Sequence, residues 1–199
     1  MAAATPIRPI APPDADLVAT IIRAAFAATE VPLDPPPSAL QVTPEAIRAH
    51  LQEGGGALYR QAGCVLWALK DGGLYISRLA VLPASRSQGI ASALLACAEA
   101  EARRLALPHL HLATRLALAG NRRLFARAGF VEGAQHAHEG YSQTDLRRSR
   151  ETTQPLAVLP DLRLETLQHG LNPVPGRAVH PGGEQVAPEG ALAVLELGP

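Results

Sequence analysis

The stretch Leu74–Ala91, LYISRLAVLPASRSQGIA, contains the pieces from which the fold of this chain can be predicted. Its first part, Tyr75–Leu82, is rich in β-branched, aromatic and aliphatic residues, which predicts a mostly buried strand. Pro83 ends this strand because proline cannot donate to a β-ladder. A short polar loop follows, and the run after Gly89 has the composition of a long helix. The stretch therefore predicts a strand, a loop and a helix in direct succession.

The loop before the predicted helix has the features of an anion-binding site. A helix N-terminus carries backbone N–H groups without helical acceptors and the positive end of the helix dipole. Gly89 has no Cβ and lets a ligand approach the backbone, Ala91 keeps the next turn narrow, and Arg86 adds a charge suited to phosphate. A diphosphate is the expected ligand, and a plain strand-to-helix turn is the alternative. The dinucleotide-binding pattern GxGxxG and the P-loop pattern are both absent from the sequence.

Three motifs, in the right order and spacing, resemble those of the GCN5-related N-acetyltransferase (GNAT) family. Arg86–Ala91 resembles the family's [QR]xxGx[GA] pyrophosphate loop, Ser77–Pro83 its fourth strand, and Asn121–Phe130 its "N…LF…GF" helix-and-strand signature. The resemblance covers roughly residues 5–142. It implies an α/β (α+β) fold with a central mixed, mostly antiparallel sheet flanked by helices, in which the fourth and fifth strands splay apart.

The resemblance also implies how acetyl-CoA would be bound. The backbone of Leu79, Ala80 and Val81 would pair with pantetheine between the splayed strands, and the amide of Leu79 would polarise the acetyl carbonyl. Asn121 would reach the pantetheine from the other side, and Phe125 would lie at the cofactor sulfur. The residues expected to hold the pyrophosphate are Arg86, Ser87, Gln88, Gly89, Ile90 and Ala91.

Two positions depart from the family pattern. Many members carry a tyrosine, the general acid for the thiolate, where this chain has Phe125, and a carboxylate on the fourth strand where this chain has Tyr75. Tyr141 is therefore a candidate proton donor. The proline-rich segment 31–39 is either a rigid connector or, by resemblance, a wall of the acceptor site.

No metal site is predicted. His109 and His111 share one face of a predicted strand, but no third His, Cys or carboxylate lies in register, which favours packed histidines. Acyl transfer by direct attack needs no nucleophilic cysteine, so Cys64 and Cys97 are predicted to be core residues.

Composition excludes several classes of protein. A formal net charge of zero and 4% aromatic residues oppose a nucleic-acid binder. No apolar run approaches the roughly 20 residues that a membrane helix needs. With two cysteines outside any spaced framework and no recognisable signal peptide, the sequence predicts a reducing, cytoplasmic location.

The resemblance stops at about Thr144. The sequence from Thr144, TDLRRSRETTQ, is charged and polar, which predicts a poor strand. The closing strand of the sheet is therefore expected from Leu156–Leu159 or Leu162–Leu167. The sequence thus predicts an acetyltransferase domain over residues 1–150 and a Pro/Gly-rich extension over 151–199, which is the candidate source of one strand and is otherwise expected to be loosely ordered.

The predicted function is that of an acetyl-CoA-dependent N-acetyltransferase acting on an amine of a small molecule or a peptide, and a homodimer is considered as its assembly. The alternative, which Phe125 and Tyr75 favour, is a catalytically weak acyl-CoA-binding module with a regulatory or sensing role. Turnover of acetyl-CoA against a panel of amines separates the two.

Overall fold

A computed structural model describes residues 6–29 and 31–149 of the chain. The predicted extension at 151–199 and both segments expected to supply the closing strand lie outside these residues. The division of the chain at residue 150 therefore stays a prediction.

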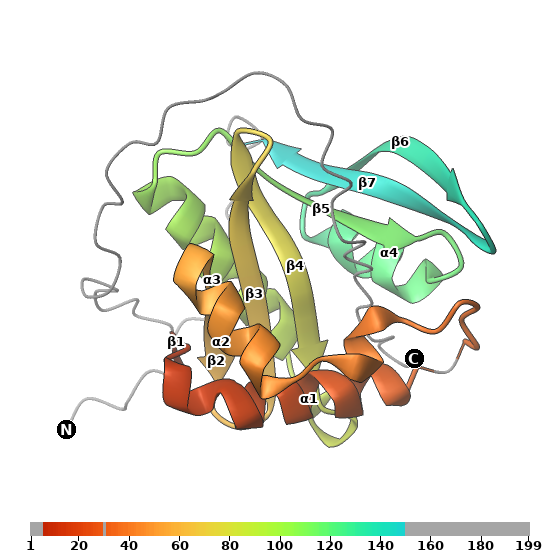
Figure 1. The fold of residues 1–199 in the computed structure, drawn as a ribbon. Coiled ribbons are helices and arrows are strands. Elements are labelled where there is room, and N and C mark those ends of the chain that lie inside the picture. The colour runs from red at the N-terminus through yellow and green to blue at the C-terminus, as the bar shows by residue number, and fades with distance from the viewer. Residues whose placement is uncertain (1–5, 30, 150–199) are drawn as a thin grey trace, which may run out of the picture.

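The described residues form one seven-stranded sheet with the strand order β1-β2-β3-β4-β5-β7-β6 (Figure 1). Every neighbouring pair is antiparallel except β4 and β5, which are parallel. The strands are β1 (Ile7–Pro9), β2 (Gly54–Tyr59), β3 (Gly63–Lys70), β4 (Gly73–Val81), β5 (His109–Arg115), β6 (Val131–His138) and β7 (Tyr141–Ser149). The α-helices are α1 (Ala15–Ala27), α2 (Pro44–Glu53), α3 (Ile90–Arg104) and α4 (Ala119–Arg127).

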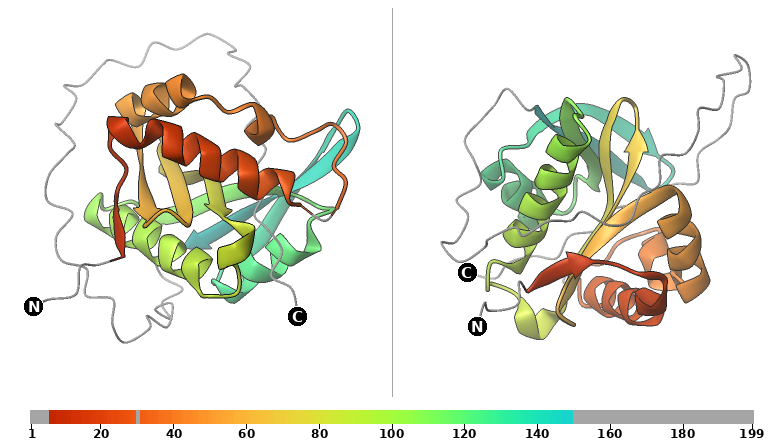
Figure 2. Two further views of the ribbon diagram at one scale, coloured as in Figure 1. Left: turned by 90° about the horizontal axis from the view of Figure 1, so that it is seen from below. Right: turned by 90° about the vertical axis from the view of Figure 1, so that its left-hand side faces the viewer.

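Helices cover both faces of the sheet (Figure 2). Side chains alternate between the faces along a strand. On β3, Cys64 and Leu66 therefore enter the core under α1 and α2, whereas Val65 enters the core under α3 and α4. On β4, Ala80 belongs to the first core, and Leu79 and Val81 belong to the second. The pocket described below opens on the face that carries α3.

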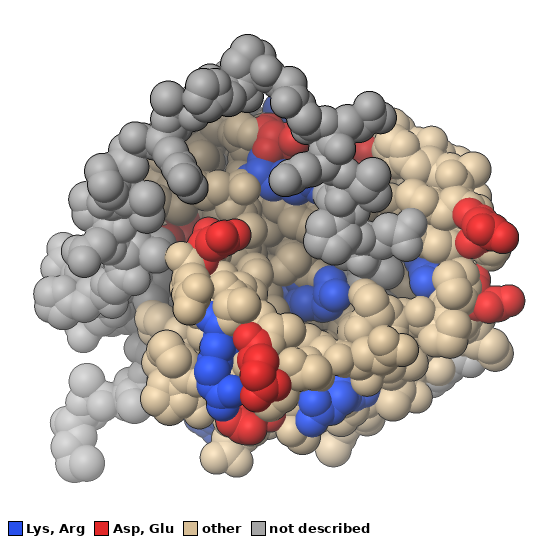
Figure 3. Space-filling view, viewed as in Figure 1, with Lys and Arg blue, Asp and Glu red and all other residues tan. Residues whose placement is uncertain are grey.

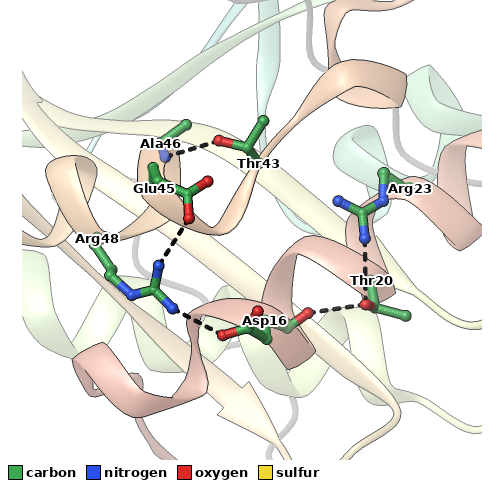
Figure 4. Close-up of polar contacts among 7 residues, drawn as sticks. All are labelled: Asp16, Thr20, Arg23, Thr43, Glu45, Ala46 and Arg48. Atoms are coloured by element: carbon green, nitrogen blue, oxygen red, sulfur yellow. Dashed lines mark hydrogen bonds and ion pairs between the residues drawn. The ribbon is translucent and has the colours of Figure 1, made fainter.

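The start of α2 and its contact with α1 follow from local sequence (Figure 4). Thr43 caps the helix, because its hydroxyl accepts a hydrogen bond from the Ala46 N–H at 3.2 Å, and Pro44 occupies the first helical position. Arg48 donates to Glu45 at 3.1 Å and to Asp16 of α1 at 2.8 Å. Both ion pairs are exposed and screened by solvent, so they orient α2 more than they stabilise it.

Strands β4 and β5 separate soon after they pair. Their parallel register consists of Leu74 opposite Leu110 and Tyr75 opposite His111. A register shift in the pairing of β4 with β3 follows at once, because Arg78 lies opposite Leu66 while Ile76 lies opposite Trp67. Beyond Tyr75 the edge of β4 faces a gap, and the predicted splay of the fourth and fifth strands is confirmed.

The prediction that the segment from Thr144 makes a poor strand is wrong. Thr144 lies in β7, which pairs with β5 on one side and with β6 on the other. Thr144, Leu146 and Arg148 are buried in alternation, as a half-buried strand requires. The charge of Arg148 hid this alternation in the sequence. An ion pair with Glu99 of α3 at 3.1 Å makes its burial tolerable.

His50 connects the end of α2 to the sheet and should make stability depend on pH. Its Nε2 lies 3.2 Å from the Gly55 carbonyl oxygen, and burial lowers the pKa of His50 below its usual value. Below about pH 6.5 the unfolded chain takes up this proton before the folded chain does, so stability falls as the pH drops through that region.

We expect the melting temperature to fall between about pH 7.5 and about pH 5, and to fall less in a His50→Gln variant, which has no imidazole to protonate. Thermal unfolding of both proteins across this range is the measurement. An equal drop in both proteins would assign the acid sensitivity to other groups.

Candidate functional site

A pocket lies where the end of β4, the following loop and the start of α3 meet. Leu124 of α4 lines its other side. The predicted cofactor-binding residues that line it are Leu79, Val81, Arg86, Ser87, Gly89, Ile90 and Ala91. Sequence reasoning missed Ser85, Ser92 and Leu124. Of these, Ser92 carries the third N–H of the predicted helix, and helix-end geometry alone could have indicated it.

The loop directs the first turn of α3 into this pocket. Ser87 and Gly89 both have positive φ, +59° and +75°, so the chain reverses sharply just before the helix. The first helical hydrogen bond runs from the Ala93 N–H to the Gly89 carbonyl at 3.0 Å. The N–H groups of Ile90, Ala91 and Ser92 therefore have no acceptor within the helix. Amides at the start of a 15-residue helix, lining a pocket, suit an anion such as a diphosphate.

Arg86 joins this loop to the other side of the sheet. Its guanidinium donates to the carbonyl of Ala28, directly after α1, at 3.2 Å. The same side chain lines the pocket. Gln88 does not line it, and its side-chain amide donates to the Ala84 carbonyl at 3.4 Å. Arg86 therefore fixes the loop in place, and Gln88 closes the turn.

The backbone of Leu79 points into the gap between β4 and β5. The Leu82 N–H donates to Ala62 at 2.8 Å, and the Ala80 carbonyl oxygen lies 3.0 Å from where a Cβ on Gly63 of β3 would be. Ala80 and Leu82 thus direct their polar groups toward β3. Because these groups alternate along a strand, those of Leu79 and Val81 point the other way, into the gap. Ala80 itself does not line the pocket, and its methyl group lies in the core under α1 and α2.

Asn121 of α4 has a buried amide without a protein partner. Its side chain is fully buried, and neither its oxygen nor its nitrogen forms a hydrogen bond to any residue in the described part of the chain. An unmet buried donor or acceptor costs roughly 1–3 kcal/mol. A polar ligand could form the hydrogen bonds that the Asn121 amide lacks, and the amides of a pantetheine arm offer both a donor and an acceptor. The residues present therefore fit acetyl-CoA.

Phe125 and Tyr141, like Ala80, Gln88 and Asn121, do not line the pocket. Phe125 is completely buried, and its ring packs edge-on against Phe130 with centroids 5.5 Å apart. Tyr141 begins β7, beside the C-terminal end of β5. Its ring stacks on His138 at 4.7 Å and lies under the Arg115 guanidinium at 4.2 Å.

The cysteines and the two β5 histidines are packed side chains. Burial raises the pKa of the Cys64 thiol to about 12 and that of Cys97 to about 11, so neither forms a thiolate nucleophile near neutral pH. His111 Nε2 lies 2.9 Å from the Lys70 carbonyl oxygen, and His109 Nδ1 accepts a hydrogen bond from Arg147 at 2.9 Å.

Comparisons with known proteins agree with this geometry. Residues 45–130 match the model of the acetyltransferase (GNAT) family. No curated protein matches the sequence. A GCN5-related N-acetyltransferase from Rhodopseudomonas palustris superposes with a TM-score of 0.60 at 19% identity, over 75% of this chain and 98% of that one.

Two further solved structures are similar. The ribosomal-protein-S18-alanine N-acetyltransferase from Escherichia coli gives a TM-score of 0.58 at 16% identity, over 72% of this chain and 92% of that one. The NatC complex bound to Gag peptide and CoA gives a TM-score of 0.54 at 18% identity, over 72% of this chain and 96% of that one. At such identities the likeness establishes the fold, and the predicted GNAT fold, with its mostly antiparallel sheet and parallel β4–β5 pair, is confirmed.

Proposed function

Because residues 45–130 carry a GNAT acetyltransferase domain, we propose that this protein transfers the acetyl group of acetyl-CoA to an amine of a small molecule or a peptide. The observation that carries the proposal is the composition of the gap. The amides of the α3 N-terminus line the pocket at one end, the Leu79 backbone points into the gap, and the unpartnered Asn121 amide is buried in α4.

Each group has a role that its position supports. The N–H groups of Ile90, Ala91 and Ser92 hold the pyrophosphate, and Gly89 permits its close approach. Asn121 hydrogen-bonds the pantetheine arm. Acetyl-CoA supplies the activated thioester carbonyl. The Leu79 N–H donates to that carbonyl oxygen and stabilises the negative charge that develops on it during attack.

Attack by the amine is direct in this scheme. The raised pKa values of Cys64 and Cys97 leave no thiolate to form an acyl-enzyme. Burial raises the pKa of Tyr75, so this phenol stays protonated and is a weak general base. The amine therefore reacts in its neutral form without a carboxylate on β4 to deprotonate it. General acid–base help contributes about 10²–10⁴-fold, so its absence slows transfer without abolishing it.

Similar structures support a peptide among the acceptors to be tested. One is named for the alanine of a ribosomal protein, and another holds a Gag peptide together with CoA. We include N-terminal peptide amines in the acceptor panel for this reason.

The second candidate function is an acyl-CoA-binding module with little turnover. The packing of Phe125 against Phe130 favours it, because a phenyl ring there cannot protonate a departing thiolate. Both candidates share the cofactor site and differ only in transfer.

The test has two stages. Calorimetry with the full chain measures acetyl-CoA binding, and a thiol-reporting dye then measures CoA release with a panel of small-molecule and peptide amines. We expect binding, and thiol release that requires an added amine. Binding without amine-dependent release would favour the module, and a lack of binding would contradict both functions.

Location and assembly stay predictions. None of the helices within residues 6–29 and 31–149 is long and apolar enough to cross a bilayer. The cytoplasmic location and the homodimer rest on the sequence alone, and sedimentation of the purified chain would test the homodimer.

A further inference from the structure

Arg78 on β4 carries a mostly buried positive charge that no carboxylate of the described residues neutralises. Its Nη1 donates to the Ser77 carbonyl at 2.7 Å and its Nη2 to the Ser38 hydroxyl at 3.2 Å. Its Nε is buried and has no partner among the described residues, and Arg78 forms no ion pair with any of them. Burial lowers the pKa of Arg78, which is the sign of a charge taken out of water without compensation.

Two other arginines of the chain differ from Arg78 in having carboxylate partners. Arg48 is exposed and still contacts two carboxylates, those of Asp16 and Glu45. Arg148 is buried, and it pairs with Glu99. A buried cation held only by neutral oxygens is costly, and an anion that binds it recovers part of that cost.

Arg78 lies on the opposite face of β4 from the cofactor pocket. It shares a strand face with Ala80, which packs under α1, and it contacts Ser38 from the segment between α1 and α2. Leu79, the next residue, lines the cofactor pocket on the α3 side. The cofactor occupies the α3 side of the gap in the proposed function. The acceptor amine must then enter from the side on which Arg78 lies.

Basic side chains lie on this face of three neighbouring strands, β4, β5 and β7, of which β4 and β5 border the gap. Leu110 and Leu112 of β5 belong to the core under α3, so the alternate residue Arg115 faces the acceptor side with Arg78. Arg147 of β7 lies on the same face, opposite His111 at the end where β4 and β5 still pair, and it donates a hydrogen bond to His109. The one carboxylate that β4, β5 and β7 place there is Asp145, and His136 Nε2 contacts it at 2.7 Å. Figure 3 looks onto this face and shows blue side chains in the recess beside α2.

A cationic acceptor side has two consequences for an amine. It attracts an acceptor that also carries a negative group. It also lowers the pKa of the amine, because neighbouring positive charges disfavour the ammonium form. The second effect supplies neutral amine at a site where β4 has Tyr75 in place of a carboxylate base.

We propose that the acceptor is an amine that also carries a carboxylate, and that Arg78 and Ser38 bind this carboxylate while the amine lies in the gap beside Leu79. The guanidinium fork and the serine hydroxyl together offer donors suited to a carboxylate. This inference rests on the proposed acetyl transfer and names its substrate class.

The test compares acceptors in matched pairs, amino acids and their amides, such as leucine with leucinamide and β-alanine with β-alaninamide. We expect kcat/KM to be at least tenfold higher for the acid of the preferred pair, about 1.4 kcal/mol. The amides have the less basic amine, so a preference for the acid cannot arise from easier deprotonation.

Arg78→Gln should lower kcat/KM for the acid by a much larger factor than for its amide, so that the preference for the acid is lost, and Arg78→Lys should restore part of the preference. Arg48→Gln, which removes an exposed and fully paired arginine, is the matched control and should change neither rate.

The outcomes separate the two levels of the argument. The carboxylate class is wrong, while acetyl transfer stands, if the unaltered protein acetylates the amides as efficiently as the acids. The same holds if Arg78→Gln lowers kcat/KM for the acid and for the amide by the same factor. If acetyl-CoA binds but no member of any pair is acetylated, the proposed transfer fails and the acceptor class fails with it. The comparison on the unaltered protein decides the matter even if an Arg78 variant does not fold.

Discussion

Replacing Gly89 with glutamate should weaken acetyl-CoA binding at least tenfold, about 1.4 kcal/mol, in a protein that stays folded. Gly89 lies at the start of α3 and lines the pocket. A glutamate there adds bulk where a ligand must approach the backbone, and it places a negative charge beside a bound diphosphate. Calorimetric titration with acetyl-CoA measures the loss.

The substitution also strains the backbone, so it needs a control with the same strain. Gly72, in the turn between β3 and β4, has a φ of +70°, close to the +75° of Gly89. A Cβ at Gly72 would meet no atom within 4 Å. Gly72→Glu therefore introduces the same residue at a similar positive φ away from the pocket, and it should bind acetyl-CoA normally. Equal affinity in Gly89→Glu would remove the α3 N-terminus from the cofactor site.

Those parts of the fold that depend on neighbours in sequence could be predicted closely. Thr43 followed by Pro44 is typical of a helix start, and α2 begins there. Asp71-Gly72 between two apolar runs is typical of a hairpin turn, and it connects β3 and β4. Gly89 takes the left-handed conformation from which α3 starts. In each case one or two residues decide the local backbone, because few other residue types satisfy the required dihedral angles or cap hydrogen bond.

Features that depend on distant partners could not be predicted. β7 looked too charged to be a strand, because the carboxylate that pairs with Arg148 comes from α3, about fifty residues earlier. Arg78 looked like an ordinary strand residue, and only the packing of Ser38 and the absence of an ion pair within the described residues distinguish it. Sequence shows which charges exist, whereas the three-dimensional arrangement decides which are compensated.

Replacing Phe125 with tyrosine should raise kcat by roughly tenfold or more, with little change in acetyl-CoA affinity, because it adds a proton donor for the departing thiolate. Phe125 follows Asn121 by four residues, so the two side chains share a face of α4. Asn121 has an unpartnered amide on that face, and the proposed function assigns it to pantetheine. A hydroxyl at position 125 would lie along the same arm.

The competing effect is overpacking. Phe125 is fully buried against Phe130, and an added oxygen in a closed core costs about 1–3 kcal/mol when the neighbours cannot move. Phe130→Tyr adds the same oxygen to the other ring of this pair, off the α4 face, and is the matched control. Thermal unfolding and steady-state kinetics on both variants separate the two effects, since overpacking lowers the melting temperature and proton donation raises kcat. If Phe125→Tyr is stable, binds acetyl-CoA normally and turns over no faster, then thiolate protonation does not limit transfer and Phe125 is a packing residue.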